Sequence, residues 1–336
     1  MIAVDAMGGD SAPFEIVKGA LIAARKGTKV ALFGWQREIQ HILDELDASW
    51  RETGLVIIDT PDLIEMGEEP ATAVRKKPTS SLVEAVKSVK DGFADAVISA
   101  GNSGALLAAA TLILGRHEGV LRPCIVAFLP STSGVPVVAA DLGASVDAKP
   151  EQLFQYAYLA SSYAQQMLGL KTIKIGLLSN GSEEGKGSAV TKEAFKLLKE
   201  GNPDFIGNVE PEDILKHRVD VVITDGFVGN VLLKTMEATL AATLQLLARE
   251  IAGLEKEVDQ EALKKIVKKV QMAVCGNTGG ALLLGVQGTV VVAHGNSNAE
   301  TMAAGILFAE RSAKCFDKTN ALIIQVAKNI RREVVL

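Results

Sequence analysis

After Met1 the chain reads Ile2-Ala3-Val4-Asp5-Ala6-Met7-Gly8-Gly9-Asp10-Ser11-Ala12-Pro13-Phe14. A short apolar run gives way to a glycine turn, and Pro13 is typical of the first turn of a helix that would continue through Val17 and Leu21. A strand, a glycine loop and a helix in this order form the repeating unit of α/β proteins. The stretch therefore predicts an α/β fold.

The same pattern recurs further along the chain. Apolar runs lead into polar glycine loops at 94–98 with 99–104, 173–178 with 179–181, 219–224 with 225–230, and 290–293 with 294–298, before a helix-like segment at 299–309. Strands that are apolar throughout and alternate with helices indicate a parallel sheet covered on both faces. We therefore predict a Rossmann-like layered fold with a mostly parallel sheet.

The loops that follow parallel strands leave from the carboxyl edge of the sheet, where ligands bind in such folds. Their Asp, Asn, Ser, Lys and His residues are expected to gather there. An alternative stays open for each loop, because glycines also shape tight turns and Asn or Ser also cap helices.

The remaining segments set the domain organisation. Two proline-containing tracts, 60–81 and 130–150, are predicted to be long irregular loops, which are often functional in a compact enzyme. Residues 232–271 carry apolar side chains at helical spacing. We expect a single catalytic domain over residues 1–336, with two lobes as an alternative, and a helical projection at 232–272.

Composition excludes several classes of protein. The chain has 35 Lys and Arg against 40 Asp and Glu, and its formal charge of -5 disfavours nucleic-acid binding. No signal-peptide pattern is expected at Met1, and the longest uninterrupted apolar run, 105–114, is about half the length needed to cross a bilayer, so no span is expected. The three cysteines are scattered, which fits a reducing cytoplasm.

Covalent and cofactor chemistry lack their usual motifs. None of the four histidines accompanies a GxSxG nucleophile elbow or an HExxH zinc motif, and no GxGxxG follows the predicted strands. Residues 181–187 resemble a Walker loop but have one residue too few between the glycines, and Gly187 stands where Ser or Thr would bind magnesium. We expect no cofactor and no metal, and keep a magnesium site as an alternative for the acids Asp5, Asp10, Asp141, Asp147 and Asp225.

The 181–187 segment does supply a cation. Lys186 lies among glycines, just before a candidate helix start at 188–191, and backbone amides in such a turn can approach an anion. This arrangement suits one phosphate group, although Lys186 is also readily interpreted as an ordinary loop lysine. The turns at Asn102 and Asn230 offer similar donors ahead of helices.

Five segments together resemble the bacterial phosphate acyltransferase family PlsX. They are residues 5–10 (Asp-Ala-Met-Gly-Gly-Asp), 99–105, 141–151, 207–210 (Gly-Asn-Val-Glu) and 224–230 (Thr-Asp-Gly-Phe-Val-Gly-Asn). They occur in the family's order, and the similarity extends from Met1 to about Ala327.

The resemblance implies an enzyme that transfers a long-chain acyl group from acyl carrier protein to inorganic phosphate. The acyl phosphate product would serve bacterial phospholipid synthesis and pass to a membrane-bound glycerol-3-phosphate acyltransferase. The implied fold is that of phosphotransacetylases and isocitrate or isopropylmalate dehydrogenases. The implied setting is a cytoplasmic homodimer that contacts the membrane peripherally through its helical projection.

This chemistry needs no enzyme nucleophile, because phosphate itself attacks the thioester and a thiolate leaves readily. The protein must hold phosphate and stabilise the developing oxyanion. For phosphate binding we select Lys186, Asn102, Ser103, Asn230 and the amides of Gly226 and Gly229. His294 and Asn180 are selected for the oxyanion or the leaving sulfur, with helix capping as the alternative.

The other loop residues are expected to support these groups. Orientation of Lys149, Lys186 and the loops is assigned to Asp5, Gly8, Gly9, Asp10, Asp141, Asp147 and Asp225. The acidic carrier protein would bind a basic patch, for which the candidates are Arg75, Lys76, Lys77, Lys264, Lys265 and Lys268. These residues are equally compatible with a solvated face that binds no partner.

Two alternatives remain open at the level of the sequence. The same framework could serve a phosphotransacetylase-like or dehydrogenase-like enzyme on a small substrate. The chain could also act as a scaffold that binds carrier protein and membrane without turnover.

Overall fold

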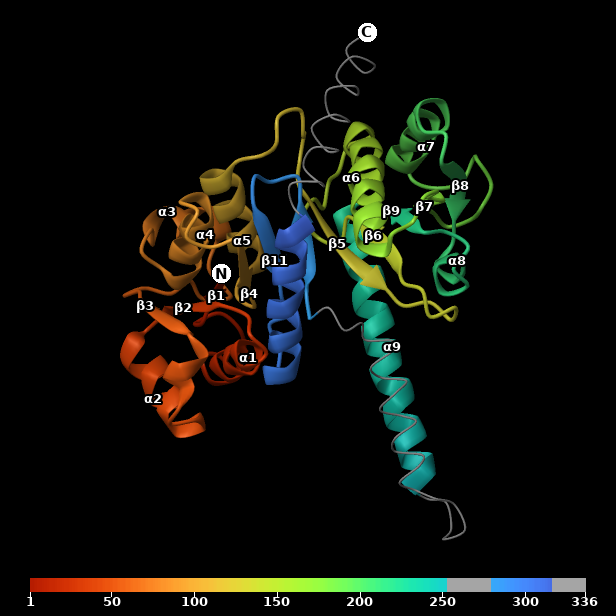
Figure 1. The fold of residues 1–336 in the computed structure, drawn as a ribbon. Helices are drawn as coiled ribbons and strands as arrows, with labels where there is room; N and C mark the ends of the chain where they lie inside the picture. The colour runs from red at the N-terminus through yellow and green to blue at the C-terminus, as the bar shows by residue number, and fades with distance from the viewer. Residues whose placement is uncertain (253–278, 316–336) are drawn as a thin grey trace. The chain divides into compact units, whose positions relative to one another are not determined.

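The computed structural model describes residues 1–252 and 279–315, which form two compact units (Figure 1). Unit 1 contains Met1–Val126 together with the described residues from 279 onward, and unit 2 begins at Ala127. Each unit carries parallel strands covered by helices, so the predicted α/β class with a mostly parallel sheet is confirmed. The single catalytic domain over 1–336 stays a prediction.

Unit 1 is built from alternating strands and helices. Its elements are β1 (Ile2–Asp5), α1 (Phe14–Arg25), β2 (Val30–Gly34), α2 (Gln36–Leu46), the short helix η1 (Trp50–Thr53), β3 (Val56–Asp59), α3 (Pro70–Lys76), α4 (Ser81–Lys90), β4 (Ala96–Ser99), α5 (Ser103–Ala109), the π-helical turn η2 (Ala110–Leu114), β5 (Cys124–Leu129), which continues into unit 2, β10 (Ala281–Leu284), β11 (Thr289–Val292) and a helix at 299–315.

The strand order of unit 1 is β3-β2-β1-β4-β11-β10-β5. β1 pairs in parallel with β2 and β4, and β11 pairs in parallel with β4. β10 runs antiparallel to both β11 and β5, which the sequence analysis did not foresee. The cause is the four-residue connection 285–288 between β10 and β11, because so short a loop can join only antiparallel neighbours.

Unit 2 repeats the alternation with fewer strands. Its elements are β6 (Val137–Ala140), α6 (Pro150–Leu168), β7 (Ile175–Leu178), α7 (Ala189–Gly201), β8 (Phe205–Val209), α8 (Pro211–Leu215), β9 (Val221–Ile223) and α9 (Gly226–Ala252). The strands lie in the order β6-β9-β7-β8, and their described pairings are all parallel. The loops after β6, β9 and β7 therefore leave from one edge.

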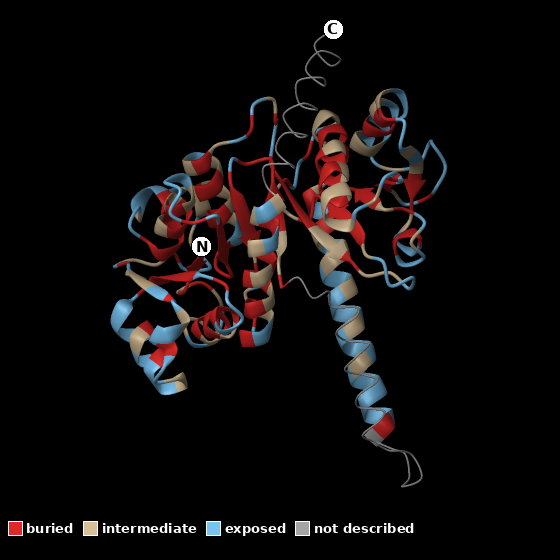
Figure 2. Ribbon diagram, in the orientation of Figure 1, coloured by how far each residue is buried: buried red, intermediate tan, exposed pale blue. Residues whose placement is uncertain are grey.

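The core of each unit consists of strands buried over their whole length. Every residue of β1, β2 and β4 is buried in unit 1, as is every residue of β6, β7 and β9 in unit 2. Figure 2 shows the buried residues concentrated in the strands and in the helix faces that cover them. Small and β-branched side chains fill these strands, as the low aromatic content of 4% leads one to expect.

Two expectations about irregular tracts were wrong in part. The tract 60–81 contains α3, whose first turn has Pro70 at its start and the Glu69 side chain as its cap. The tract 130–150 contains β6, which lies beside β9. The long helix predicted from 232 begins earlier, at Gly226, and the part of the predicted projection beyond Ala252 lies outside the described residues.

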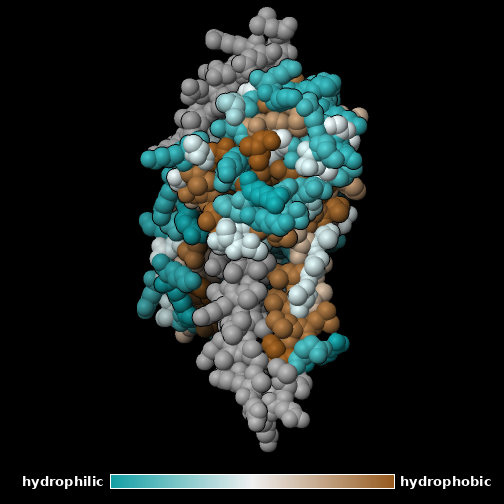
Figure 3. Space-filling view, turned by 90° about the vertical axis from the view of Figure 1, so that its right-hand side faces the viewer, coloured by the Kyte–Doolittle hydropathy of each residue, from teal (hydrophilic) through white to brown (hydrophobic). Residues whose placement is uncertain are grey.

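Helix α9 is mostly exposed along its length (Figure 2). The most apolar 18 consecutive residues within Gly226–Ile251 have a mean hydropathy of 1.3, and none of these 18 residues is buried, so by length and composition the helix could cross a membrane. Figure 3 shows hydrophobic surface along the described part of this helix. The expectation that the chain has no membrane span rested on the length of uninterrupted apolar runs. In α9 small polar residues interrupt the apolar ones, so this long apolar helix was not recognised.

Candidate active site

Asp5 organises the loops at the carboxyl edge of the unit 1 sheet. It is the last residue of β1 and is 2% exposed. Its carboxylate accepts hydrogen bonds from Ser81 Oγ (2.6 Å), Ser99 Oγ (2.7 Å) and the Met7 amide (3.3 Å). Burial raises the pKa of Asp5, and the two serine hydroxyls oppose that rise. Asp5 thus joins β1, β4 and α4, and its role in orienting Lys149 and Lys186 stays a prediction.

Gly8 and Gly9 allow two loops to touch. A Cβ atom on Gly8 would lie 2.6 Å from Asp5 Oδ2 and 2.7 Å from the Gly101 nitrogen, so no side chain fits. Gly9 has a φ of +122°, and the next residue, Asp10, donates its amide to the carbonyl oxygen of Gly295 at 2.7 Å. The loop after β1 therefore packs against both the β4 and β11 loops. His294, one residue before Gly295, is exposed at this edge.

Asn102 is engaged within unit 1. Its Oδ1 atom accepts the Ala105 amide (3.0 Å) and so caps α5, while its Nδ2 atom donates to the carbonyl oxygens of Glu65 (3.4 Å), Met66 (3.1 Å) and Glu68 (2.9 Å). The capping alternative therefore describes Asn102 in this structure, and its donors already have acceptors. Ser103, the first residue of α5, is exposed.

In unit 2, Asp141 holds the loop that follows β6. This fully buried carboxylate accepts the backbone amides of Gly143 (3.2 Å), Ala144 (3.0 Å) and Ser145 (2.7 Å). Asp141 therefore holds three successive backbone amides of its own loop in place. Its role in orienting Lys149 and Lys186 stays a prediction.

The structure contradicts the prediction that the Gly226 and Gly229 amides are free donors. The Gly226 amide donates to the carbonyl oxygen of Ser145 (2.9 Å), and that of Gly229 to the carbonyl oxygen of Asp225 (2.9 Å). These two glycines instead allow α9 to approach the Asp141 loop closely. A Cβ atom on Gly229 would lie 2.0 Å from the Asp141 carbonyl oxygen, so only glycine lets α9 pack on this loop.

Asp225 and Asn230 flank these glycines. Asp225 Oδ1 accepts the amides of Phe227 (3.0 Å) and Val228 (2.9 Å) and so caps α9. Asn230 is half-buried, and its Cγ atom lies 3.8 Å from the position that a Cβ atom on Gly143 would take. Asn230 therefore faces the loop that Asp141 holds.

Lys186 sits in a loop fixed at three points between β7 and α7. Asn180 Oδ1 accepts the Gly187 amide (2.9 Å), Asn208 Nδ2 donates to the Glu183 carbonyl oxygen (2.8 Å), and Glu184 pairs with Lys199 of α7 (2.8 Å). The aliphatic stem of Lys186 lies over Gly181, where a Cβ atom would be 2.9 Å from Lys186 Cγ.

The ammonium group of Lys186 is exposed and has no partner among the residues that the structure describes. Ser188 Oγ accepts the Thr191 amide (3.2 Å) and caps α7 immediately after this loop. A helix N-terminus and an unpaired ammonium together favour an anion. Asn180 closes the loop with its oxygen, and its amide nitrogen has no acceptor within the described part of the chain.

The remaining predicted residues lie near the end of the Asp141 loop, on or next to α3, or outside the described chain. Asp147 and Lys149 are exposed, and the Lys149 amide donates to Gln152 Oε1 at the start of α6 (2.8 Å). Arg75 and Lys76 are exposed on α3, whereas Lys77 Nζ bonds Glu68 Oε1 (2.5 Å) and the Leu63 carbonyl oxygen (3.0 Å). Lys264, Lys265 and Lys268 lie outside the described residues.

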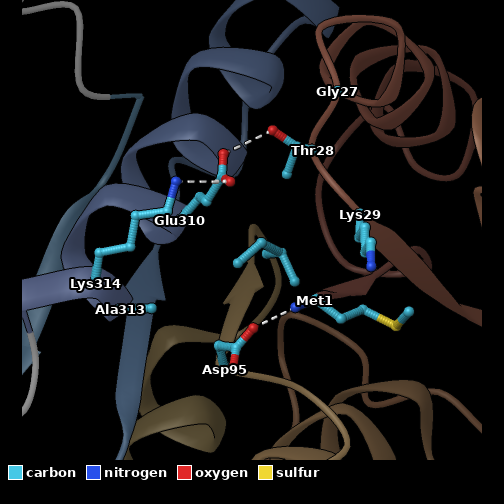
Figure 4. Close-up of a pocket in the computed structure, with 9 residues that line it drawn as sticks. Met1, Gly27, Thr28, Lys29, Asp95, Glu310, Ala313 and Lys314 are labelled. Atoms are coloured by element: carbon cyan, nitrogen blue, oxygen red, sulfur yellow. Dashed lines mark hydrogen bonds and ion pairs between the residues drawn. The ribbon is translucent and has the colours of Figure 1, made fainter.

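A pocket of about 350 Å³ lies at the opposite, amino edge of unit 1 (Figure 4). Glu310 receives hydrogen bonds there from Thr28 Oγ1 (2.9 Å) and Lys314 Nζ (3.0 Å), and the Met1 amino group pairs with Asp95. The Lys314 hydrogen bond lowers the pKa of Glu310. The pocket contains none of the predicted site residues.

Several structural partners were missed at the level of the sequence. Ser81 and Ser99 bind Asp5, Asn208 fixes the Lys186 loop, and Lys199 anchors Glu184. Asn208 and Ser99 had a signal, because they lie in the 207–210 and 99–105 segments that carried the resemblance. Ser81 had none, because it lies outside these segments and 76 residues away from Asp5.

Fold and loops define an α/β protein with polar glycine loops at the carboxyl edges of parallel strands and an unpaired lysine at a helix N-terminus. The family model described as "Fatty acid synthesis protein" matches residues 1–316, and the chain belongs to that family. It is 42% identical over 318 residues to the phosphate acyltransferase of Dictyoglomus turgidum, covering 93% of this chain and 94% of the relative. It is 44% identical over 309 residues to that of Ligilactobacillus salivarius, covering 90% and 91%.

Solved structures share the fold at low sequence identity. A phosphotransacetylase from Streptococcus pyogenes has a TM-score of 0.62 and 18% identity, with 94% of each chain covered. A 4-hydroxythreonine-4-phosphate dehydrogenase from Klebsiella pneumoniae has a TM-score of 0.52 and 14% identity, covering 93% of this chain and 98% of that one. The predicted fold relationship is confirmed, and the relatives' shared name makes this chain an acyltransferase.

Proposed function

We propose that this acyltransferase transfers a long-chain fatty acyl group from acyl carrier protein to inorganic phosphate, giving acyl phosphate for bacterial phospholipid synthesis. The observation that carries the proposal is the fixed loop at the N-terminus of α7, which presents a Lys186 ammonium without a partner among the described residues. The name "phosphate acyltransferase" of relatives at about 40% identity supports phosphate as the acceptor.

The reaction needs binding and charge stabilisation rather than a protein nucleophile. A phosphate oxygen forms a bond to the thioester carbonyl carbon, the carbonyl oxygen takes up the negative charge, and the carbon–sulfur bond then breaks to release the carrier protein's thiolate, which takes a proton from water. We assign phosphate binding to Lys186 and Asn230 in unit 2 and to Ser103 in unit 1, because these side chains have no acceptor among the described residues. Stabilisation of the oxyanion or of the sulfur is assigned to Asn180 and His294.

Replacing the cation tests this assignment. We expect Lys186→Ala to raise the KM for phosphate and to lower kcat/KM by about 100-fold, because one preorganised charged donor typically contributes that much. Lys192→Ala is the matched control, since Lys192 is an exposed lysine in the first turn of α7. If both variants keep wild-type kinetics, Lys186 is an ordinary loop lysine.

Substrate preference separates the proposal from the small-substrate alternatives. The proposal expects palmitoyl-carrier protein to be consumed faster than acetyl thioesters, and expects no absorbance change with a nicotinamide. Preference for the acetyl donor would favour a phosphotransacetylase-like enzyme. Carrier-protein binding that survives Lys186→Ala, without turnover in the wild type, would favour the scaffold.

We further propose that the protein is a cytoplasmic homodimer that contacts the membrane peripherally and passes its product to a membrane-bound glycerol-3-phosphate acyltransferase. The apolar side chains that α9 exposes, among them Val231 (51%), Leu246 (54%) and Leu247 (44%), support contact with another apolar surface. Light scattering tests the dimer, and flotation with anionic phospholipid vesicles tests the membrane contact. A monomer that stays with the soluble fraction would contradict both.

A further inference from the structure

The chain between β3 and α3, Thr60–Glu69, lies along the carboxyl edge of the unit 1 sheet, and we call it the strap. Near β2, the Trp35 indole donates to the Pro61 carbonyl oxygen (3.3 Å). At the β4 loop, Asn102 holds three strap carbonyls. At the β11 loop, Met66 Cε lies 3.4 Å from the position of a Cβ atom on Gly295. The strap therefore spans the edge from β3 to β11, where ligands bind in such sheets.

Hydrogen bonds from Lys77, at the end of α3, and within the strap itself also fix its conformation. Lys77 Nζ donates to the Leu63 carbonyl oxygen (3.0 Å) and to Glu68 Oε1 (2.5 Å), and the Glu65 amide donates to the same carboxylate (2.7 Å). The Lys77 hydrogen bond lowers the pKa of Glu68, as expected for a carboxylate that stays ionised.

The far end of the strap is anchored as well. The Glu69 side chain accepts the Thr72 amide (2.8 Å) and caps α3. Gly104 packs against Pro70, where a Cβ atom would lie 2.7 Å from Pro70 Cγ. A ten-residue segment without regular structure is thus held in one conformation.

These contacts present one apolar side chain to solvent. Met66 is 50% exposed and lies beside Gly295, with the Asp10 carboxylate 3.5 Å from the same Cβ position. An exposed apolar residue by itself needs no explanation. Here, however, the buried Asn102 uses its amide donors to hold the carbonyl groups around Met66. Methionine adapts its shape to apolar partners, which suits a flexible hydrocarbon chain.

We propose that the strap contacts the acyl chain of the donor and that Met66 favours long chains over short ones. Asn102 and Lys77 are then positioning residues that hold the strap. This inference rests on the proposed acyl transfer and adds to it the residue that contacts the apolar part of the substrate.

Chain-length kinetics test the role of Met66. Met66→Ser is compared with the wild type on palmitoyl- and butyryl-carrier protein at saturating phosphate. We expect kcat/KM for the palmitoyl donor to fall by about three- to tenfold, the loss typical of removing apolar contact with about one or two methylenes, and butyryl transfer to stay within about twofold. Phe93→Ser is the control, because Phe93 is equally exposed (49%) just before β4, at the opposite edge of the sheet.

Equal losses with both donors, or no loss with either, would overturn the assignment of Met66. A wild type that releases no thiol in the presence of phosphate would instead overturn the proposed function, and this result is distinct because it appears before any variant is compared.

A second variant separates positioning from phosphate binding. Asn102→Ser keeps a residue able to cap α5 but loses the amide donors to the strap. We expect it to lower the preference for the palmitoyl donor while leaving the KM for phosphate unchanged. Trp35 fluorescence, measured in a Trp50→Phe background, should also change because Trp35 bonds the strap. A raised phosphate KM with an unaltered chain-length preference would make Asn102 a phosphate ligand and overturn its positioning role.

Discussion

Alanine at Gly229 should disrupt the unit 2 site. The added Cβ atom would lie 2.0 Å from the Asp141 carbonyl oxygen, whereas ordinary contact begins at 3.4 Å, so α9 and the Asp141 loop must separate by 1.4 Å (3.4 − 2.0). If the Gly226–Ser145 hydrogen bond takes up that movement, its length rises from 2.9 Å to 4.3 Å (2.9 + 1.4) and it breaks.

The magnitude follows from opposing terms. Overpacking costs about 1–3 kcal/mol and a lost hydrogen bond about 1 kcal/mol. Higher helix propensity of alanine returns about 1 kcal/mol. We expect Gly229→Ala to lower the free energy of unfolding by about 1–3 kcal/mol, measured by urea titration. Because Asn230 moves with the helix, kcat/KM should fall by about 100-fold.

Gly185→Ala is the control for this prediction. Gly185 is an exposed loop glycine with no heavy atom within 4 Å of its added Cβ position, so its substitution should leave the free energy of unfolding nearly unchanged. The reasoning is refuted if Gly229→Ala unfolds like the Gly185 variant and turns over like the wild type.

Two further predictions concern buried polar residues. Burial raises the pKa of Asp5 above its ordinary value of 3.8, so the native state binds the proton more tightly than the unfolded state. The free energy of unfolding therefore falls as pH rises above about 4, until Asp5 ionises in the folded protein. Asp5→Asn should therefore gain stability relative to the wild type as pH rises above about 4, by about 1.4 kcal/mol for each unit of pKa difference; a pH-independent difference in urea titrations would contradict this. Asn208→Ala removes the hydrogen bond to the Glu183 carbonyl oxygen and should raise the KM for phosphate about tenfold through the loosened Lys186 loop, while Asn202→Ala, at the C-terminal end of α7, should not. An unchanged phosphate KM would show that Asn208 is only structural.

The repeating strand, loop and helix pattern was sufficient to predict the fold class and five of the strands. It failed for β6 because Val137–Ala140 lies within a tract rich in Pro, Gly and Ser, which indicated a loop. It failed for α3 because three prolines indicated a loop, although Pro70 occupies the helix start where proline is favoured.

The site residues show which inferences a sequence can support. Capping by Asp225 and the helix start at Ser188 follow from local spacing. The role of the glycines of α9 cannot be inferred in this way, because a tight turn and a close approach to a distant loop both favour glycine. The same holds for Lys77, whose place in the basic run 75–77 predicted a partner surface, while its ammonium bonds to Glu68.

The central claim is that phosphate accepts the acyl group. The most direct measurement mixes the purified protein with palmitoyl-carrier protein, with and without inorganic phosphate, and follows free thiol while hydroxylamine traps acyl phosphate as the hydroxamate. The account predicts that thiol and hydroxamate appear together, in equal amounts and only with phosphate. Thiol released without phosphate would identify a thioesterase, and either that result or no release at all would contradict the account.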